Sequence, residues 1–88
     1  MYHKDLSLDV AISSLGKLKA WAIIEKMKTK DEEEREILTR QIEMYSEEEQ
    51  VIYFYADKHP ALWNSVMDKI NRLYCPIIKA EYLRNIGR

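Results

Sequence analysis

The composition of this 88-residue chain, 47% apolar and 33% charged, predicts a single globular domain over residues 1–88 and is too apolar for a disordered chain. Two glycines and two prolines are too few for the closely spaced turns of a β-sandwich or barrel. The net charge of −1 is unevenly distributed: residues 1–30 carry +3, residues 31–50 carry −7 and residues 51–88 carry +3.

The beginning of the chain and its single cysteine bear on the compartment. The first nine residues, MYHKDLSLD, lack the apolar core of a secretory signal, and no apolar run approaches the length of a membrane span. Cys75 has no second cysteine to pair with, which excludes an intramolecular disulfide. These features predict a cytoplasmic protein without a membrane segment.

Residues 7–28 have the periodicity of an amphipathic helix. Its predicted inward face holds Leu8, Ala11, Leu15, Leu18 and Ala22. Ser7 is the expected N-cap. Gly16 in the middle of the helix costs about 1 kcal/mol relative to alanine. The glycine is explained either by a close helix crossing or as a tolerated defect.

Two capping boxes follow, and they raise a question about helix boundaries. Residues 29–32, TKDE, predict the start of a second helix. Its inward residues are expected to be Ile37, Leu38, Ile42 and Tyr45. Residues 46–49, SEEE, repeat the motif, and five polar residues, 46–50, interrupt the apolar stripe. We therefore expect a break or sharp bend at Ser46, with one helix over residues 31–57 as the alternative.

The last third of the chain is predicted to be helical from Pro60, which suits the first turn of a helix. A spacing of three and four residues runs through Trp63, Val66, Ile70, Leu73, Ile77 and Ala80, and keeps its phase across Pro76. An interior proline costs about 3 kcal/mol, so a kink or break is expected there. The predicted fold is all-α, a small antiparallel bundle of three to five helices with a proline-kinked or broken C-terminal helix.

Residues capable of catalysis or metal binding are scarce. His3, His59 and Cys75 have none of the spacings of a zinc site. The chain also lacks a glycine-rich phosphate loop and a nucleophile elbow. Cys75 stands among apolar neighbours and is best explained as a core residue. The sequence thus predicts a protein that is not an enzyme and has no catalytic residues, cofactor or metal.

Aromatic residues gather at one corner of the predicted fold. Tyr53, Phe54 and Tyr55 are consecutive and span about 200° of a helix, so a domain this small cannot bury all three. Trp63 lies across the corner, and Tyr and Trp are enriched at protein interfaces. These four residues are a candidate protein-binding surface, with packing of the corner on itself as the alternative.

The acidic segments at the two predicted helix starts, Glu32 to Glu34 and Glu47 to Glu49, form a second candidate surface. Glu47, Glu48 and Glu49 favour a helix N-terminus, and they also offer negative charge to a basic partner. Small regulators and inhibitors of phage and mobile elements act in this way as a class. This chain is comparable to them in composition only, because it contains no motif that they share. The sequence therefore predicts a protein-binding module that works through both surfaces and self-associates, for example as a homodimer.

The alternative is a small nucleic-acid-associated regulator. The C-terminal helix carries the cations that it would use: Lys69, Arg72, Lys79, Arg84 and Arg88. The sequence pI near 6.1 makes nucleic acid the less favoured partner.

Overall fold

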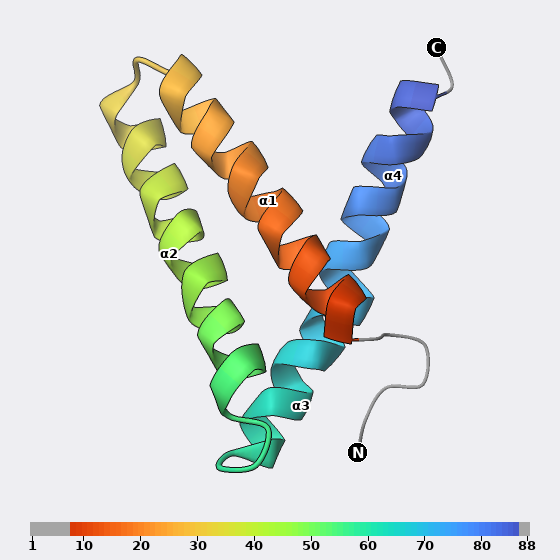
Figure 1. The fold of residues 1–88 in the computed structure, drawn as a ribbon. Coiled ribbons are helices and arrows are strands. Elements are labelled where there is room, and N and C mark those ends of the chain that lie inside the picture. Colours follow the sequence, from red (N-terminus) through yellow and green to blue (C-terminus); the bar gives the residue numbers. More distant parts are fainter. Residues whose placement is uncertain (1–7, 87–88) are drawn as a thin grey trace.

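The computed structural model describes residues 8–86, and nearly all of them are helical. The elements are α1 (Leu8–Lys28), α2 (Glu32–Phe54), α3 (Pro60–Lys69), a π-helical turn η1 (Ile70–Tyr74) and α4 (Cys75–Ile86) (Figure 1). The last three follow one another without a gap. No strand occurs in the described residues, which confirms the all-α prediction. Ser7, the predicted N-cap of α1, lies outside them.

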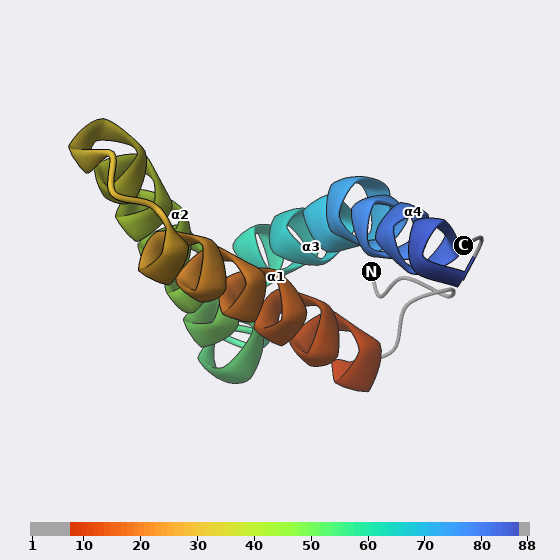
Figure 2. The ribbon, with the colours of Figure 1, turned by 90° about the horizontal axis from the view of Figure 1, so that it is seen from above.

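The three helical segments form an open V. α1 and α2 run antiparallel as a hairpin, and the joined α3–η1–α4 segment crosses it near the N-terminal end of α1 (Figure 1). Two perpendicular views show that the closed end of the hairpin and the C-terminal end of α4 lie far apart (Figures 1 and 2). The molecule measures 42 × 32 × 16 Å. Its least dimension is thus not much larger than the diameter of about 10–12 Å of a single helix.

The hydrophobic core lies at the vertex of the V, where α1, α2 and the α3–η1 junction meet. Its buried members are Ala11, Leu15, Leu18, Ile52, Val66, Met67, Ile70 and Tyr74. The predicted face of α1 is buried from Ala11 to Ala22, whereas Leu8 is exposed. A side chain added at Gly16 would meet nothing within 4 Å, so no close crossing within the chain requires that glycine.

The predicted break at Ser46 is wrong, because α2 continues through this position to Phe54. The polar interruption of the apolar stripe is accommodated by tertiary partners. Glu48 bonds Lys69 and Tyr74, and Glu49 bonds Lys19. A stripe interrupted by carboxylates can remain on the inner face of a helix when cations and a hydroxyl lie opposite it. Ile37, which was expected to face inward, is exposed.

The N-terminus of α2 also differs from the prediction. The N-cap is Asp31, whose side chain accepts a hydrogen bond of 3.0 Å from the amide of Glu33, while Thr29 accepts one from the amide of Asp31. Thr29 therefore lies outside the helix as part of its entry turn. Glu32, Glu33 and Glu34 occupy the first turn, where negative charge is favourable.

These two corrections predict opposite effects of alanine at the two sites. Asp31→Ala removes a working N-cap and should lower the free energy of unfolding by about 1 kcal/mol. Ser46→Ala places a better helix former in the interior of α2 and should leave stability unchanged or raise it by up to about 0.5 kcal/mol. Urea denaturation followed by circular dichroism measures both values. A loss at Ser46 as large as that at Asp31 would contradict the continuous helix.

The π-helical turn changes the phase of the last helix, so the predicted continuous phase is wrong. The amide of Cys75 donates to the carbonyl of Ile70, five residues back, and this adds one residue to the turn. Burial consequently passes from Ile70 to Tyr74, while Leu73 and Ile77 are exposed.

The turn also explains how the helix accommodates its proline. Pro76 lies two residues after η1 within an unbroken helical segment. Proline has no amide hydrogen, and its ring crowds the carbonyl four residues earlier in a regular α-helix. A π-type turn directly before it opens the hydrogen-bond ladder where proline would otherwise disrupt it.

Candidate functional site

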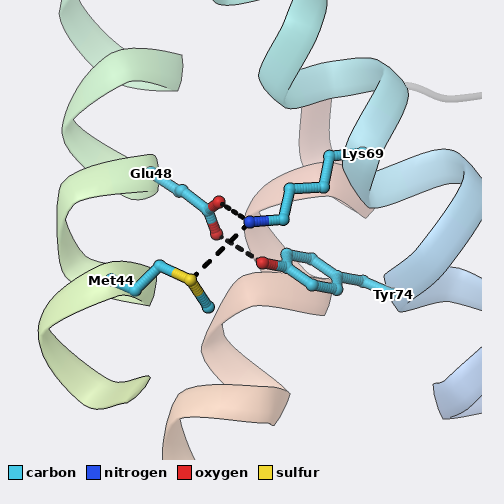
Figure 3. A network of polar contacts seen from close by, with 4 residues as sticks. All are labelled: Met44, Glu48, Lys69 and Tyr74. Carbon is cyan, nitrogen blue, oxygen red and sulfur yellow. Dashed lines mark hydrogen bonds and ion pairs between the residues drawn. The ribbon is translucent and has the colours of Figure 1, made fainter. Parts of the chain in front are cut away.

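A polar cluster lies at the edge of the core, between α2 and η1 (Figure 3). Glu48 is buried and accepts two hydrogen bonds of 2.7 Å, one at each carboxylate oxygen. The donors are the Lys69 ammonium and the Tyr74 hydroxyl. Lys69 Nζ also lies 3.6 Å from the sulfur of Met44 and 5.4 Å from the centre of the Tyr74 ring. We call Met44, Glu48, Lys69 and Tyr74 the Glu48 cluster.

Burial and the Glu48 carboxylate set the protonation of this cluster. Burial, with a further contribution from Glu48, raises the pKa of Tyr74 to about 12. Burial alone would lower the pKa of Lys69, but the hydrogen bonds to Glu48 and Tyr74 and the charge of Glu48 outweigh it and raise that pKa. Tyr45, whose ring meets the Tyr74 ring edge-on at 5.6 Å, also has a raised pKa, mainly through burial.

These protonation states favour a structural role over a catalytic one. At neutral pH Lys69 stays an ammonium and Tyr74 a neutral phenol, so neither group is poised to accept a proton or to act as a nucleophile. Both already donate to Glu48. The cluster therefore attaches the π-helical turn to the middle of α2.

Alkaline pH should weaken this attachment. A pKa raised in the folded state means that the unfolded chain loses its proton first, so stability falls as the pH rises. The contributions of Tyr74 and Lys69 are complete below about pH 10 and are lost as the pH rises through the folded-state pKa values, which is about 12 for Tyr74. We expect the melting temperature of the original chain to fall above about pH 10. The melting temperature of Tyr74→Phe should fall less steeply over the same range. Parallel pH profiles for the two proteins would contradict this assignment.

The predicted aromatic residues divide into an inner and an outer pair. Tyr53 and Phe54 are 59% and 63% exposed, and their ring centres lie 6.1 Å apart. Tyr55 and Trp63 are half-buried. The Tyr55 ring meets His59 edge-on, and the Trp63 indole donates to the carbonyl of Ile52 at 3.2 Å. The corner thus packs partly on itself while presenting Tyr53 and Phe54 to solvent. We call Tyr53, Phe54, Tyr55 and Trp63 the aromatic corner.

The three glutamates before this corner point in different directions. Glu47 is exposed, Glu48 is buried in the cluster, and Glu49 pairs with Lys19 of α1 at 3.0 Å. Consecutive residues on a helix are separated by about 100°, so one run of acids can serve three environments. Of the three, Glu47 is the one that is exposed.

Most cations of the C-terminal helical segment are engaged by carboxylates of the same chain. Lys69 pairs with Glu48, Arg72 with Asp68 at 3.1 Å, and Arg84 with Glu81. Arg88 lies outside the described residues. Lys79 is exposed, and no ion pair is recorded for it within residues 8–84. The Arg72 and Arg84 side chains nevertheless remain 75% and 62% exposed beside their carboxylate partners.

A groove that the sequence did not predict lies between the arms of the V. Trp21, Ile24, Glu25 and Lys28 of α1 line one side, and Ile77 and Glu81 of α4 line the other. The open hollow between them has a volume of about 420 Å³. We call these six residues the α1–α4 groove. It was missed because Ile77 was assigned to the core. One pattern in the sequence could have indicated a second packing surface: apolar residues occur on several sides of α1 and not on its inward face alone.

Metal and membrane chemistry find no further support in residues 8–86. No group of three or more His, Cys, Asp or Glu side chains in this range could hold a metal ion. None of its helices combines the length and apolar character of a bilayer span. Cys75 is half-buried, with its sulfur 3.7 Å from the hydroxyl oxygen of Ser14.

Comparisons with known proteins do not assign a class. No protein-family model, curated protein or solved structure matches the chain.

Proposed function

We propose that the protein is a small, non-enzymatic protein-binding module of the cytoplasm that also self-associates. Its contact surface for another protein is the outer part of the aromatic corner, Tyr53 and Phe54, with Glu47 beside it. Tyr55 and Trp63 hold this surface from within. Glu48 and Glu49 support it indirectly, because their bonds to Lys69 and Lys19 fix the end of α2 against the rest of the chain.

The observation that carries the proposal is the exposure of two adjacent aromatic rings on the last turn of α2. Tyr53 and Phe54 are each about 60% exposed, yet the backbone beneath them is helical up to Phe54. Aromatic side chains that are held in place lose little conformational entropy on binding and contribute much of the energy of protein interfaces. The carboxylate of Glu47 favours a partner with basic groups at the rim of its binding site.

Site-specific photo-crosslinking in the native host tests this function. A benzoylphenylalanine at position 54 should capture a second protein that the same group at position 40 does not. Arg40 is a suitable control because it is exposed on the same helix, about 21 Å away along its axis. The captured protein should bind the purified chain and lose at least about tenfold in affinity to Tyr53→Ala or Phe54→Ala. Capture of the same proteins from both positions, or of none, would contradict the proposal.

The nucleic-acid alternative receives less support from the contacts of the C-terminal segment. Three of its cations are held by Glu48, Asp68 and Glu81. A duplex-binding protein gains affinity by releasing counterions through unengaged Lys and Arg residues. Binding to duplex DNA with a steep salt dependence would favour this alternative over the protein-binding module.

A further inference from the structure

The whole 88-residue chain exposes more surface than a folded monomer of its mass normally does. The chain exposes 6513 Å², whereas a folded monomer of its mass exposes about 5,400 Å². Its radius of gyration is 14.3 Å, compared with about 12 Å for a compact domain of 88 residues. The excess of about 1,100 Å² includes the terminal residues and is an upper bound for the helices. One partner of a standard protein interface buries about 800 Å², which is of the same order.

α1 exposes apolar residues on more than one side, and one of them, Ile24, lines the α1–α4 groove. Its inner face packs into the core, yet Val10, Ile23, Ile24 and Met27 are exposed on other sides. A helix that is apolar around its circumference normally has neighbours on more than one side. α1 and α4 diverge toward their C-terminal ends (Figure 1).

We propose that the α1–α4 groove is the interface of a homodimer, in which α4 of each copy lies in the groove of the other. This inference deepens the proposed self-association and assigns it to a surface distinct from the aromatic corner. A twofold interface uses the same residues on both copies, so the groove and its occupant must be complementary to each other. Here α4 has both roles, because it lines the groove of its own copy and occupies the groove of the other copy.

The groove has this self-complementary chemistry. Trp21, Ile24 and Ile77 supply apolar surface that α4 of the second copy can cover, since α4 itself exposes Ile77. Glu25 and Lys28 of α1 and Glu81 of α4 line the same groove, and Glu81 also pairs with Arg84 of its own chain. In a twofold dimer Lys28 of one copy can meet Glu81 of the other, and the second contact repeats the first. The two V-shaped chains would thereby close into the antiparallel bundle that the sequence predicts.

The oligomeric state of the purified full-length chain tests the interface. Light scattering at about 100 µM should give twice the 10.5 kDa mass of one chain. Ile24→Glu and Ile77→Glu should each weaken the dimer at least about 100-fold, because they bury a charge in the groove. Ile37→Glu is the matched control. Ile24, Ile77 and Ile37 are 46%, 51% and 56% exposed, but Ile37 lies on α2 outside the groove.

A charge exchange gives a second readout that does not depend on apolar packing. Lys28→Glu and Glu81→Lys should each weaken self-association at least about tenfold, because each homodimer then juxtaposes like charges. An equimolar mixture of the two variants should dimerise again, because both contacts then pair a lysine with a glutamate. Circular dichroism of every variant should show the helical content of the original chain.

Several outcomes would overturn the inference. These are a monomeric original chain, dimers that persist in both groove variants, dimers lost equally in Ile37→Glu, and a mixture that stays monomeric. None of them bears on the aromatic corner, whose test is the crosslink from position 54. A monomeric chain that still gives that crosslink would remove the dimer and retain the protein-binding function. A dimer that gives no crosslink from position 54 would retain the dimer interface and remove the protein-binding function.

Discussion

Leu15→Ala is expected to lower the free energy of unfolding by about 3 kcal/mol, within the range of about 2–5 kcal/mol for such changes in buried cores. Leu15 has no exposed surface and lies in the cluster where α1, α2 and the α3–η1 segment meet. The open V has little apolar core away from this vertex, so few neighbouring groups can move in to fill the space. A domain of this length has a total stability of only about 4–13 kcal/mol. Urea denaturation followed by circular dichroism measures the loss.

Ile37→Ala is the control for this prediction. It also shortens a branched aliphatic side chain in a helix, but Ile37 is more than half exposed. Its effect should stay within about 0.5 kcal/mol, as is usual for surface substitutions. Equal effects at the two sites would contradict the location of the core at the vertex.

The second large effect is expected for Glu48→Ala, which should cost about 2–3 kcal/mol at neutral pH. The substitution removes the acceptor of both the Lys69 ammonium and the Tyr74 hydroxyl. The Tyr74 hydroxyl is then left in a buried position without that partner, which is the main part of the cost. The Lys69 side chain is 35% exposed and can turn toward water, which keeps the loss below that of a fully buried ion pair.

Glu47→Ala provides an adjacent control. Glu47 has the same side chain one residue earlier on α2, but it is exposed. Its replacement should change the free energy of unfolding by less than about 0.5 kcal/mol. Glu48→Gln is expected to fall between the two alanine variants, because the amide still offers an oxygen to one donor but carries no charge. Similar losses at positions 47 and 48 would contradict the buried cluster.

The difference between Glu47 and Glu48 illustrates the limit of sequence reasoning for this chain. Both belong to one acidic run, and the capping-box pattern assigned the run to a helix start. The pattern describes local bonding alone, whereas Glu48 is buried because Lys69 and Tyr74, 21 and 26 residues away, lie opposite it. A single sequence carries no local signal for such a partnership. The exposure of Tyr53 and Phe54 was predictable, because the angular spread of consecutive side chains on a helix does not depend on distant residues.

The sequence by itself determined the all-α class, the buried face of α1 from Ala11 to Ala22 and the start of the third helix at Pro60, because side-chain periodicity and proline geometry are properties of the local backbone. Only the tertiary structure decided that α2 is continuous through Ser46, that the π-helical turn moves Ile77 out of the core, and that the arms of the V leave a groove between α1 and α4. The physical reason is that the alternatives differ little in local energy: a broken or continuous helix at Ser46, a regular or a π-helical turn, and a closed or an open angle between the helices. The balance among them is set by contacts between residues far apart in the chain.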